Sequence, residues 1–301
     1  MPVTLPPLTR APDERVNWVS SIPFLLVHVL CFAVLLTGFT WTAVGLFVFM
    51  YFGRAFFVTA AYHRYFSHKS YRLNRFWQFI FAFQAEATAQ KGVLWWASNH
   101  RHHHRYSDLQ NDLHSPRKGF WWSHVGWILS DKYKDTDYSA IKDFAKYPEL
   151  RLLERRQGTP PFIYGIAAFL IGGIVGTGGG WSWNGAMAGL VVGFFWSTVL
   201  LWHATFLVNS AAHVLGRRRY ETTDTSRNSF LIALATGGEG WHNNHHHYQA
   251  SARQGFFWWE LDPTYYVLKL MSWVGIVKDL KAPPARVLHP GPEAERELIA
   301  A

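Results

Sequence analysis

The chain has 301 residues with a formal net charge of +9 at pH 7, and 16% of its residues are charged. That charged fraction is well below the roughly 25% of a typical soluble chain, which argues against a disordered or fibrous protein. The single cysteine, Cys31, excludes a disulfide framework and any cysteine-based zinc or iron–sulfur site.

Four apolar runs follow one another along the chain, at residues 22–39, 41–61, 162–177 and 185–208. Each run is close to the 20 or so residues that a helix needs to cross a bilayer. Arg54 is the only Lys, Arg, Asp or Glu that they contain. Because the two runs of each pair are joined by a short connection, the pattern predicts an all-α integral membrane protein with four transmembrane helices in two hairpins. The alternative is that the runs are core helices of a soluble protein.

The basic residues indicate which side of the membrane each segment occupies. Apart from Arg54, Lys and Arg are confined to the N-terminal tail, to residues 62–160 and to the region after residue 209. Because segments rich in Lys and Arg stay on the cytoplasmic side, we expect both termini to be cytoplasmic. Residues 62–160 and 209–285 should then form a cytoplasmic helical cap, within a single domain over 1–301. The basic charge therefore points to an anionic membrane surface, and no nucleic-acid-binding motif accompanies it.

Three short histidine-rich motifs lie in these cytoplasmic segments. The first joins His63 and His68, and the other two share the pattern H-x-x-H-H. The two copies of that pattern consist of His100, His103 and His104, and of His242, His245 and His246. On a helix, positions i, i+3 and i+4 share one face. Three imidazoles can then converge on one metal ion or on two neighbouring ions, with iron, zinc, copper and nickel all suited to such ligands.

Eight clustered imidazoles are too many for one metal ion, whereas two ions with four or five ligands each fit the count. No Glu-x-x-His pair lies in a plausible helix, so the site differs from that of a soluble ferritin-like di-iron bundle. His102 and His247 are offset from the shared face, and we leave them out of the ligand set. Other histidines are also expected outside the site: His28, His114, His124, His203 and His289.

The segments HRYFSH, NHRHHHRYSD and GWHNNHHH resemble the three histidine boxes of the membrane fatty acid desaturases. The resemblance runs from about Ala61 to Tyr265 and includes the flanking segments DLHSPRKGFWWSHVGW and NSAAH. It is closest to the acyl-CoA (stearoyl-CoA) Δ9 desaturases, including bacterial forms. It implies an enzyme that inserts a cis double bond, at Δ9, into a saturated acyl chain while it consumes O2 and two electrons.

The resemblance also implies the residues of the site. Two iron ions would be held by nine histidines: His63, His68, His100, His103, His104, His213, His242, His245 and His246. Asn209 would reach one iron through a water molecule. The acyl tunnel would be lined by Trp96, Thr205 and Gln90. Asp108 and Asp112 could orient ligand imidazoles, although capping at the surface explains them equally well.

The acyl carrier and the electron donor are partners that the resemblance implies. Acyl-CoA is the expected carrier, and its phosphates could meet basic residues: Arg72, Arg75, Lys91, Arg101, Arg105, Arg117 and Lys118. Cytoplasmic topology explains these residues without a ligand, and related enzymes act on acyl chains in phospholipid or on acyl carrier protein. Only ten residues follow the His-Pro-Gly at 289–291, so no fused cytochrome b5 domain is expected. A separate ferredoxin, rubredoxin or cytochrome b5 with its reductase would supply the electrons.

Two other functions stay open at this point. A lipid hydroxylase on the same scaffold would share the histidine boxes. A histidine-rich membrane metal transporter would need ionisable residues along a pathway inside the spans, and the four apolar runs are nearly free of them.

Overall fold

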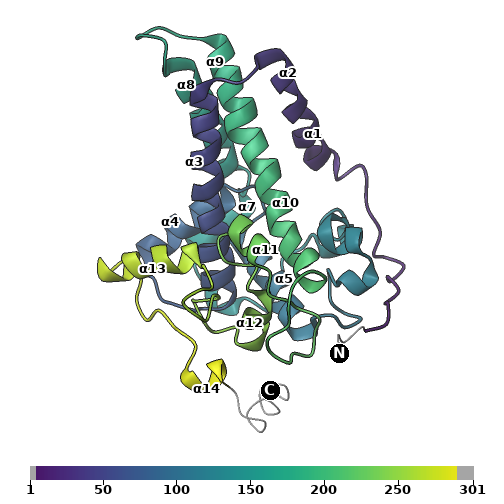
Figure 1. Ribbon diagram of the computed structural model, residues 1–301. Coiled ribbons are helices and arrows are strands. Elements are labelled where there is room, and N and C mark those ends of the chain that lie inside the picture. The colour runs from purple at the N-terminus through teal and green to yellow at the C-terminus, as the bar shows by residue number, and fades with distance from the viewer. Residues whose placement is uncertain (1–4, 290–301) are drawn as a thin grey trace.

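The computed structural model describes residues 5–289, and within that range β-structure is limited to isolated bridges. Two continuous helices dominate the arrangement (Figure 1). The first consists of α3 (Trp41–Phe57) and a π-helical continuation (Val58–Ser67). The second consists of α9 (Trp183–Ala188), a π-helical segment (Gly189–Trp196), α10 (Ser197–Asn209) and a final 3-10 turn (Ala211–His213). They have 27 and 31 residues, and each contains an 18-residue stretch with a mean hydropathy of 1.7, so both are long and apolar enough to cross a membrane.

Two shorter apolar helices accompany the long ones. α1 (Ile22–Leu30) runs through a 3-10 turn (Cys31–Ala33) into α2 (Val34–Thr37), and α8 (Thr159–Ile174) packs against α9. The 16 residues of α8 reach about 24 Å, which is less than the roughly 30 Å of a bilayer core. The turn after α2 and the turn between α8 and α9 lie at the same end of the molecule (Figure 1). Each predicted run therefore forms a helix, while the four-span arrangement stays a prediction.

The remaining helices are short and gather toward the end of the long helices that is remote from the two turns (Figure 1). They are α4 (Arg75–Glu86), α5 (Val93–Tyr106), α6 (Lys142–Ala145), α7 (Pro148–Arg155), α11 (Phe230–Ala235), α12 (His242–His247), α13 (Pro263–Trp273) and α14 (Ala285–Leu288). The largest hydrophobic core joins Tyr62 and Phe66 of the first long helix to Phe81, Leu94 and Leu268 of this layer. The layer corresponds to the predicted cap, and the side of a membrane on which it lies stays a prediction.

Both long helices extend beyond their predicted ends. The sequence predicts ends at residues 61 and 208, but the helices continue to Ser67 and His213. Every residue from Tyr62 to Ser67 is buried, because α4 and α5 pack against this polar extension. A hydropathy pattern ends where polar residues begin, whereas tertiary packing allows the helix to go on.

Arg54, the charged residue within the apolar runs, is buried in α3. Its guanidinium donates hydrogen bonds to the hydroxyls of Ser197 and Thr198 at 2.6 and 2.8 Å, and to the carbonyl of Ala87 at 3.3 Å. The side chain therefore ties the two long helices to the loop before α5, and its donors find partners inside the protein, as a buried cation requires.

Glycines allow α8 to approach the second long helix closely. A Cβ added to Gly172 would lie 2.4 Å from the carbonyl oxygen of Gly185 and 2.9 Å from the Cα of Gly189. Backbones at this separation leave no room for a side chain, which is typical of small-residue packing between membrane helices.

We expect Gly172→Leu to push α8 away from the second long helix and to destabilise the protein by about 1–3 kcal/mol, the usual cost of overpacking. The midpoint of thermal unfolding of detergent-purified protein measures this effect. Gly45→Leu is the matched control, because no atom lies within 4 Å of a Cβ at that position. Equal midpoints for the two variants would contradict the packing argument.

Candidate functional site

The histidine motifs converge on two groups at the junction of the long helices and the layer of short helices, and His68, His100 and His104 are half-buried there. The five-histidine group consists of His63, His68, His100, His104 and His245. The four-histidine group consists of His103, His213, His242 and His246. Within each group the facing ring nitrogens all lie within 4.8 Å of one another. The structure therefore brings together all nine histidines that the resemblance implies, in two separate groups.

Each H-x-x-H-H helix contributes to both groups. In α5, His100 and His104 belong to the five-histidine group, while His103 belongs to the other. α12 divides in the same way. His242 and His246, at positions i and i+4, belong to the four-histidine group, and His245, at position i+3, belongs to the five-histidine group. Positions i and i+4 point in nearly the same direction, and position i+3 is displaced to one side. Of the two arrangements that the spacing allows, the structure therefore favours two neighbouring metal positions.

The ring nitrogens are spaced as metal ligands are. Nε2 of His104 lies 2.9 Å from Nε2 of His100 and 2.9 Å from Nε2 of His245. Two nitrogens bound at right angles to one ion, with bonds of about 2.1 Å, are about 3 Å apart. In the four-histidine group, Nε2 of His103 and Nε2 of His246 are buried without a hydrogen-bond partner. Because buried polar atoms rarely stay unpaired, these nitrogens fit a metal ion.

Burial keeps the imidazoles in the neutral form that binds metals. Desolvation, reinforced by the neighbouring histidines, lowers the pKa of His100, His104, His242 and His245 well below the ordinary value. At neutral pH these rings therefore offer a lone pair without first losing a proton.

Buried aspartates orient two of the rings from behind. Nδ1 of His103 donates to Asp112 at 3.0 Å, and Nδ1 of His213 donates to Asp108 at 3.2 Å. Burial alone would raise the pKa of Asp112, but the adjacent His103 holds it at about 2. Both aspartates are completely buried, so surface capping, which the sequence left open, is wrong. They fix the rings so that Nε2 faces into the group.

Sequence reasoning misses two further carboxylates of this kind. Asp224 accepts a hydrogen bond from Nδ1 of His246 at 2.5 Å, and a carboxylate oxygen of Glu239 lies 2.5 Å from Nδ1 of His63. Asp224 lies in an irregular loop where no periodicity singles it out. The only signal for Glu239 is that it precedes the third histidine motif by three residues.

Two buried glutamates hold the first turn of α5 and thereby the three of its histidines that belong to the two groups. Glu86 accepts a hydrogen bond from the N–H of Val93 at 3.1 Å, and Glu154 accepts from the N–H groups of Leu94 and Trp95 at 2.9 and 3.1 Å. Carboxyl groups in this position satisfy donors that have no partner within the helix. Desolvation raises the pKa of Glu86 to about 8, so this carboxyl is mostly protonated at neutral pH.

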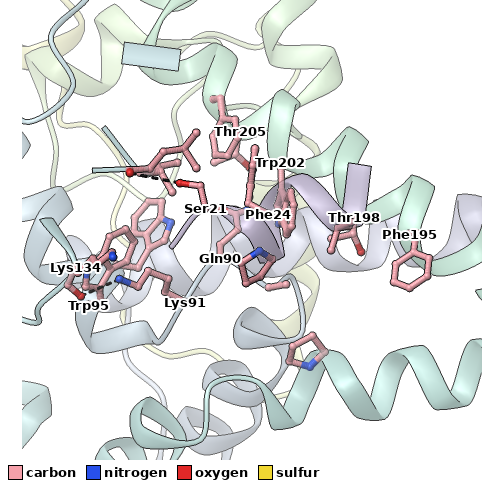
Figure 2. A pocket seen from close by; sticks show the side chains of 18 of the residues that line it. Ser21, Phe24, Gln90, Lys91, Trp95, Lys134, Phe195, Thr198, Trp202 and Thr205 are labelled. Atoms are coloured by element: carbon pink, nitrogen blue, oxygen red, sulfur yellow. Dashed lines mark hydrogen bonds between the residues drawn. The ribbon is translucent and has the colours of Figure 1, made fainter. Parts of the chain in front are cut away.

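A cavity of about 710 Å³ adjoins the five-histidine group. Its lining includes Trp96, Gln90, Thr205 and Asn209, the four residues other than histidine that the resemblance implies. The Gln90 amide donates a hydrogen bond to the Thr205 hydroxyl at 3.0 Å, and Figure 2 shows both side chains among those that line the cavity. A second cavity of about 40 Å³ shares Trp96, Thr205 and Asn209 with the first and reaches Ala55 of α3.

The histidines that were expected outside the site belong to neither group: His28, His102, His114, His124, His203, His247 and His289. His114 is nevertheless close, since its ring centroid lies 4.2 Å from that of His103. His28, His203 and His124 form a separate chain in which consecutive ring nitrogens are 3.1 and 3.0 Å apart.

The chain is similar to known proteins over most of its length. A family model described as fatty acid desaturase matches residues 17–271. The chain is 37% identical to the acyl-CoA 5-desaturase AL21 of Anemone leveillei, over 85% of this chain and 77% of that protein. It is 33% identical to an sn-2 palmitoyl-lipid 9-desaturase of Nostoc sp. (strain 36), over 93% and 96% of the two chains. It is 34% identical to an sn-1 stearoyl-lipid 9-desaturase of Anabaena variabilis, over 91% and 97%.

The raised pKa of Glu86 makes stability depend on pH. In the unfolded chain this carboxyl ionises near its ordinary value of 4.5, but in the folded protein it stays protonated up to about pH 8. Between these values the folded state binds more protons, so this group makes stability fall as the pH rises.

We expect Glu86→Gln, which keeps an acceptor for Val93, to remove this dependence. The free energy of unfolding of the variant minus that of the wild type should rise between about pH 4.5 and 8, by roughly 1.4 kcal/mol per pH unit at most. Above that range this difference should level off. Denaturant unfolding across this pH range measures it. Glu149→Gln is the control, because Glu149 pairs with Arg75 at the surface and should show no such gain. A constant difference between wild type and Glu86→Gln would contradict the assignment.

Proposed function

The chain belongs to the fatty acid desaturase family, and from this premise we propose that it is a di-iron desaturase that inserts a cis double bond, at Δ9, into a saturated acyl chain. The observation that carries the proposal is the pair of histidine groups beside an elongated apolar cavity. The reaction removes two hydrogens from neighbouring methylene groups, takes up O2, two electrons and two protons, and releases two water molecules.

Iron is the metal we propose for both histidine groups. The five-histidine and four-histidine groups would each hold one ion, and Asn209 would reach one of them through a water molecule. An iron pair with O2 would supply an oxidant strong enough to attack an unactivated C–H bond, which side chains alone cannot do. The chain's own residues keep the ligands neutral, fix the rings through buried carboxylates and exclude bulk water.

Trp96, Thr205 and Gln90 are proposed to position the acyl chain. Trp96 stacks against the ligand His100, with ring centroids 4.9 Å apart, and against Tyr62, with centroids 5.3 Å apart. Its indole therefore contacts the five-histidine group and lines both cavities. An acyl chain that passes from the large cavity into the small one would bend at Trp96 and Thr205, which would place one pair of methylenes beside the metal. Two 9-desaturases align with more than nine-tenths of the chain, which supports Δ9.

We further propose that all four apolar helices cross the bilayer and that the histidine groups lie on the cytoplasmic side. The two turns at the opposite end contain no Lys or Arg, as the positive-inside rule expects of external loops. The electrons would come from a separate ferredoxin, rubredoxin or cytochrome b5 with its reductase, and the basic surface suits an acidic partner. The resemblance places acyl-CoA first as carrier, and the relatives divide between acyl-CoA and acyl-lipid substrates.

Expression of the chain in a host without endogenous Δ9 activity, followed by fatty acid analysis with gas chromatography–mass spectrometry, tests the proposal. We expect a new cis monoene in cells with the wild type and none with His103→Ala, which removes one ligand of the four-histidine group. The purified variant should contain about one iron fewer per chain than the wild type, because the five-histidine group stays complete.

His102→Ala is the matched control, since His102 is the preceding residue and belongs to neither group. It should retain both product and iron. A hydroxy acid in place of the monoene would identify a hydroxylase. Wild-type protein without iron, or equal products from the two alanine variants, would contradict the proposal.

A further inference from the structure

We infer that the acyl chain reaches this site from within the bilayer, between α1 and α8, while it is still esterified to a membrane glycerolipid. The inference rests on the proposed desaturase function and concerns the carrier of the acyl chain. Three features of the molecule carry it: the walls of the large cavity, the charges at its rim, and the pairing of the basic residues that an acyl-CoA would need.

Part of the cavity wall comes from the apolar helices. Phe24 and Val27 of α1, Phe162 and Ile166 of α8, and Trp202 of α10 all line it. Phe162 is 67% exposed and Ile166 is 43% exposed, so the α8 side chains that line the cavity also reach the outer surface. Because that surface is the apolar flank of the helices, we expect it to face lipid, and the cavity then opens sideways into the bilayer.

The charged side chains that line the cavity are Lys91 and Lys134. Figure 2 shows Lys91, Trp95 and Lys134 at one end of the cavity and Thr198 and Phe195 at the other. The segment 131–137 at the polar end holds three aspartates and two lysines.

Both lysines of this segment are already paired, since Lys134 contacts Asp131 and Lys132 contacts Asp13 at 2.9 Å. The Lys91 ammonium donates to the carbonyl of Lys134 at 2.8 Å. Among the described residues that line the cavity, Lys91 is then the one cation without a carboxylate ion-pair partner. A single such cation suits an uncharged ester better than the several phosphate charges of a coenzyme A group.

The basic residues that could have bound coenzyme A are largely engaged within the chain. Arg101 donates two hydrogen bonds to Asp143, at 3.0 Å each, and two more to backbone carbonyls of the first long helix. Lys118 is buried against Glu14 at 2.7 Å. The others with partners are Arg72 with Asp279, Arg75 with Glu149, and Arg117 with the carbonyls of Pro6 and Asp108. Arg101 and Lys118 are thus engaged within the fold, whereas Arg72 and Arg75 pair with carboxylates at the surface. Fewer unpaired cations remain than composition alone suggested, which weakens the case for acyl-CoA.

A short pulse of isotopically labelled stearate in cells that express the full chain separates the possible carriers. Labelled monoene is followed over time in glycerolipids, acyl-CoA and free fatty acids by mass spectrometry. We expect it to appear first in glycerolipids, with the acyl-CoA pool lagging behind. Earlier appearance in acyl-CoA or in free acid would overturn the inference and leave the desaturase intact. Labelled monoene in no pool would overturn the proposed function and this inference with it.

A pair of variants on α8 tests the route. Ile166→Trp places a bulky ring at the proposed opening and should slow monoene formation in glycerolipids about tenfold, as misplacement of a substrate does. Ile171→Trp is the matched control, because Ile171 has a similar exposure of 41% and does not line the cavity. It should stay within about twofold of the wild type, and both variants should keep their iron. Equal rates for the two variants would overturn the lateral route.

Discussion

Nine imidazole rings must be packed neutral and close together in one buried volume, and most of the fold serves this requirement. A hydrogen bond to one nitrogen of an imidazole fixes the ring so that the other nitrogen can face a metal. Asp108, Asp112, Asp224 and Glu239 do this for four of the rings, and each of these carboxylates is itself buried. The carboxylates in turn need hydrogen bonds from backbone and hydroxyl groups. The short helices and irregular loops around the site supply those donors.

The helical framework explains how so many rings reach two positions. α5 and α12 each divide their histidines between the groups, so each metal position would depend on both helices. The five-histidine group also takes His63 from the first long helix, and the four-histidine group takes His213 from the end of the second. The first long helix changes to π-helical geometry over Val58–Ser67, the stretch that carries His63. Wider turns of this kind are frequent at functional sites, because they redirect side chains without ending the helix. A displacement of α5 or α12 would disturb both groups at once.

The same arrangement puts a polar centre next to an apolar cavity. Trp96 and the ligand His100 stack on each other and both line the cavity, and the hydrogen bond between Gln90 and Thr205 gives the lining one fixed polar contact. Much of the remaining wall consists of apolar side chains, from the apolar helices and from the layer of short helices. A substrate that is itself part of the bilayer would therefore meet the site without leaving an apolar environment, and the metal centre would stay at the level where the long helices meet the polar layer.

The sequence by itself determined the local patterns: the apolar runs, the spacing of the histidines, and a resemblance specific enough to include His213, which spacing alone would not have selected. The apolar runs and the histidine spacing depend on short-range periodicity, which hydropathy and helical geometry reveal in a single sequence. Only the tertiary structure decided how the histidines divide five to four, that Asp224 and Glu239 orient two of them, and that the long helices continue to Ser67 and His213. It also decided which charged side chains form ion pairs, because a pair such as Arg101 with Asp143 joins residues far apart in the chain. Contacts of this kind depend on packing between distant segments and leave no periodic signal in a single sequence.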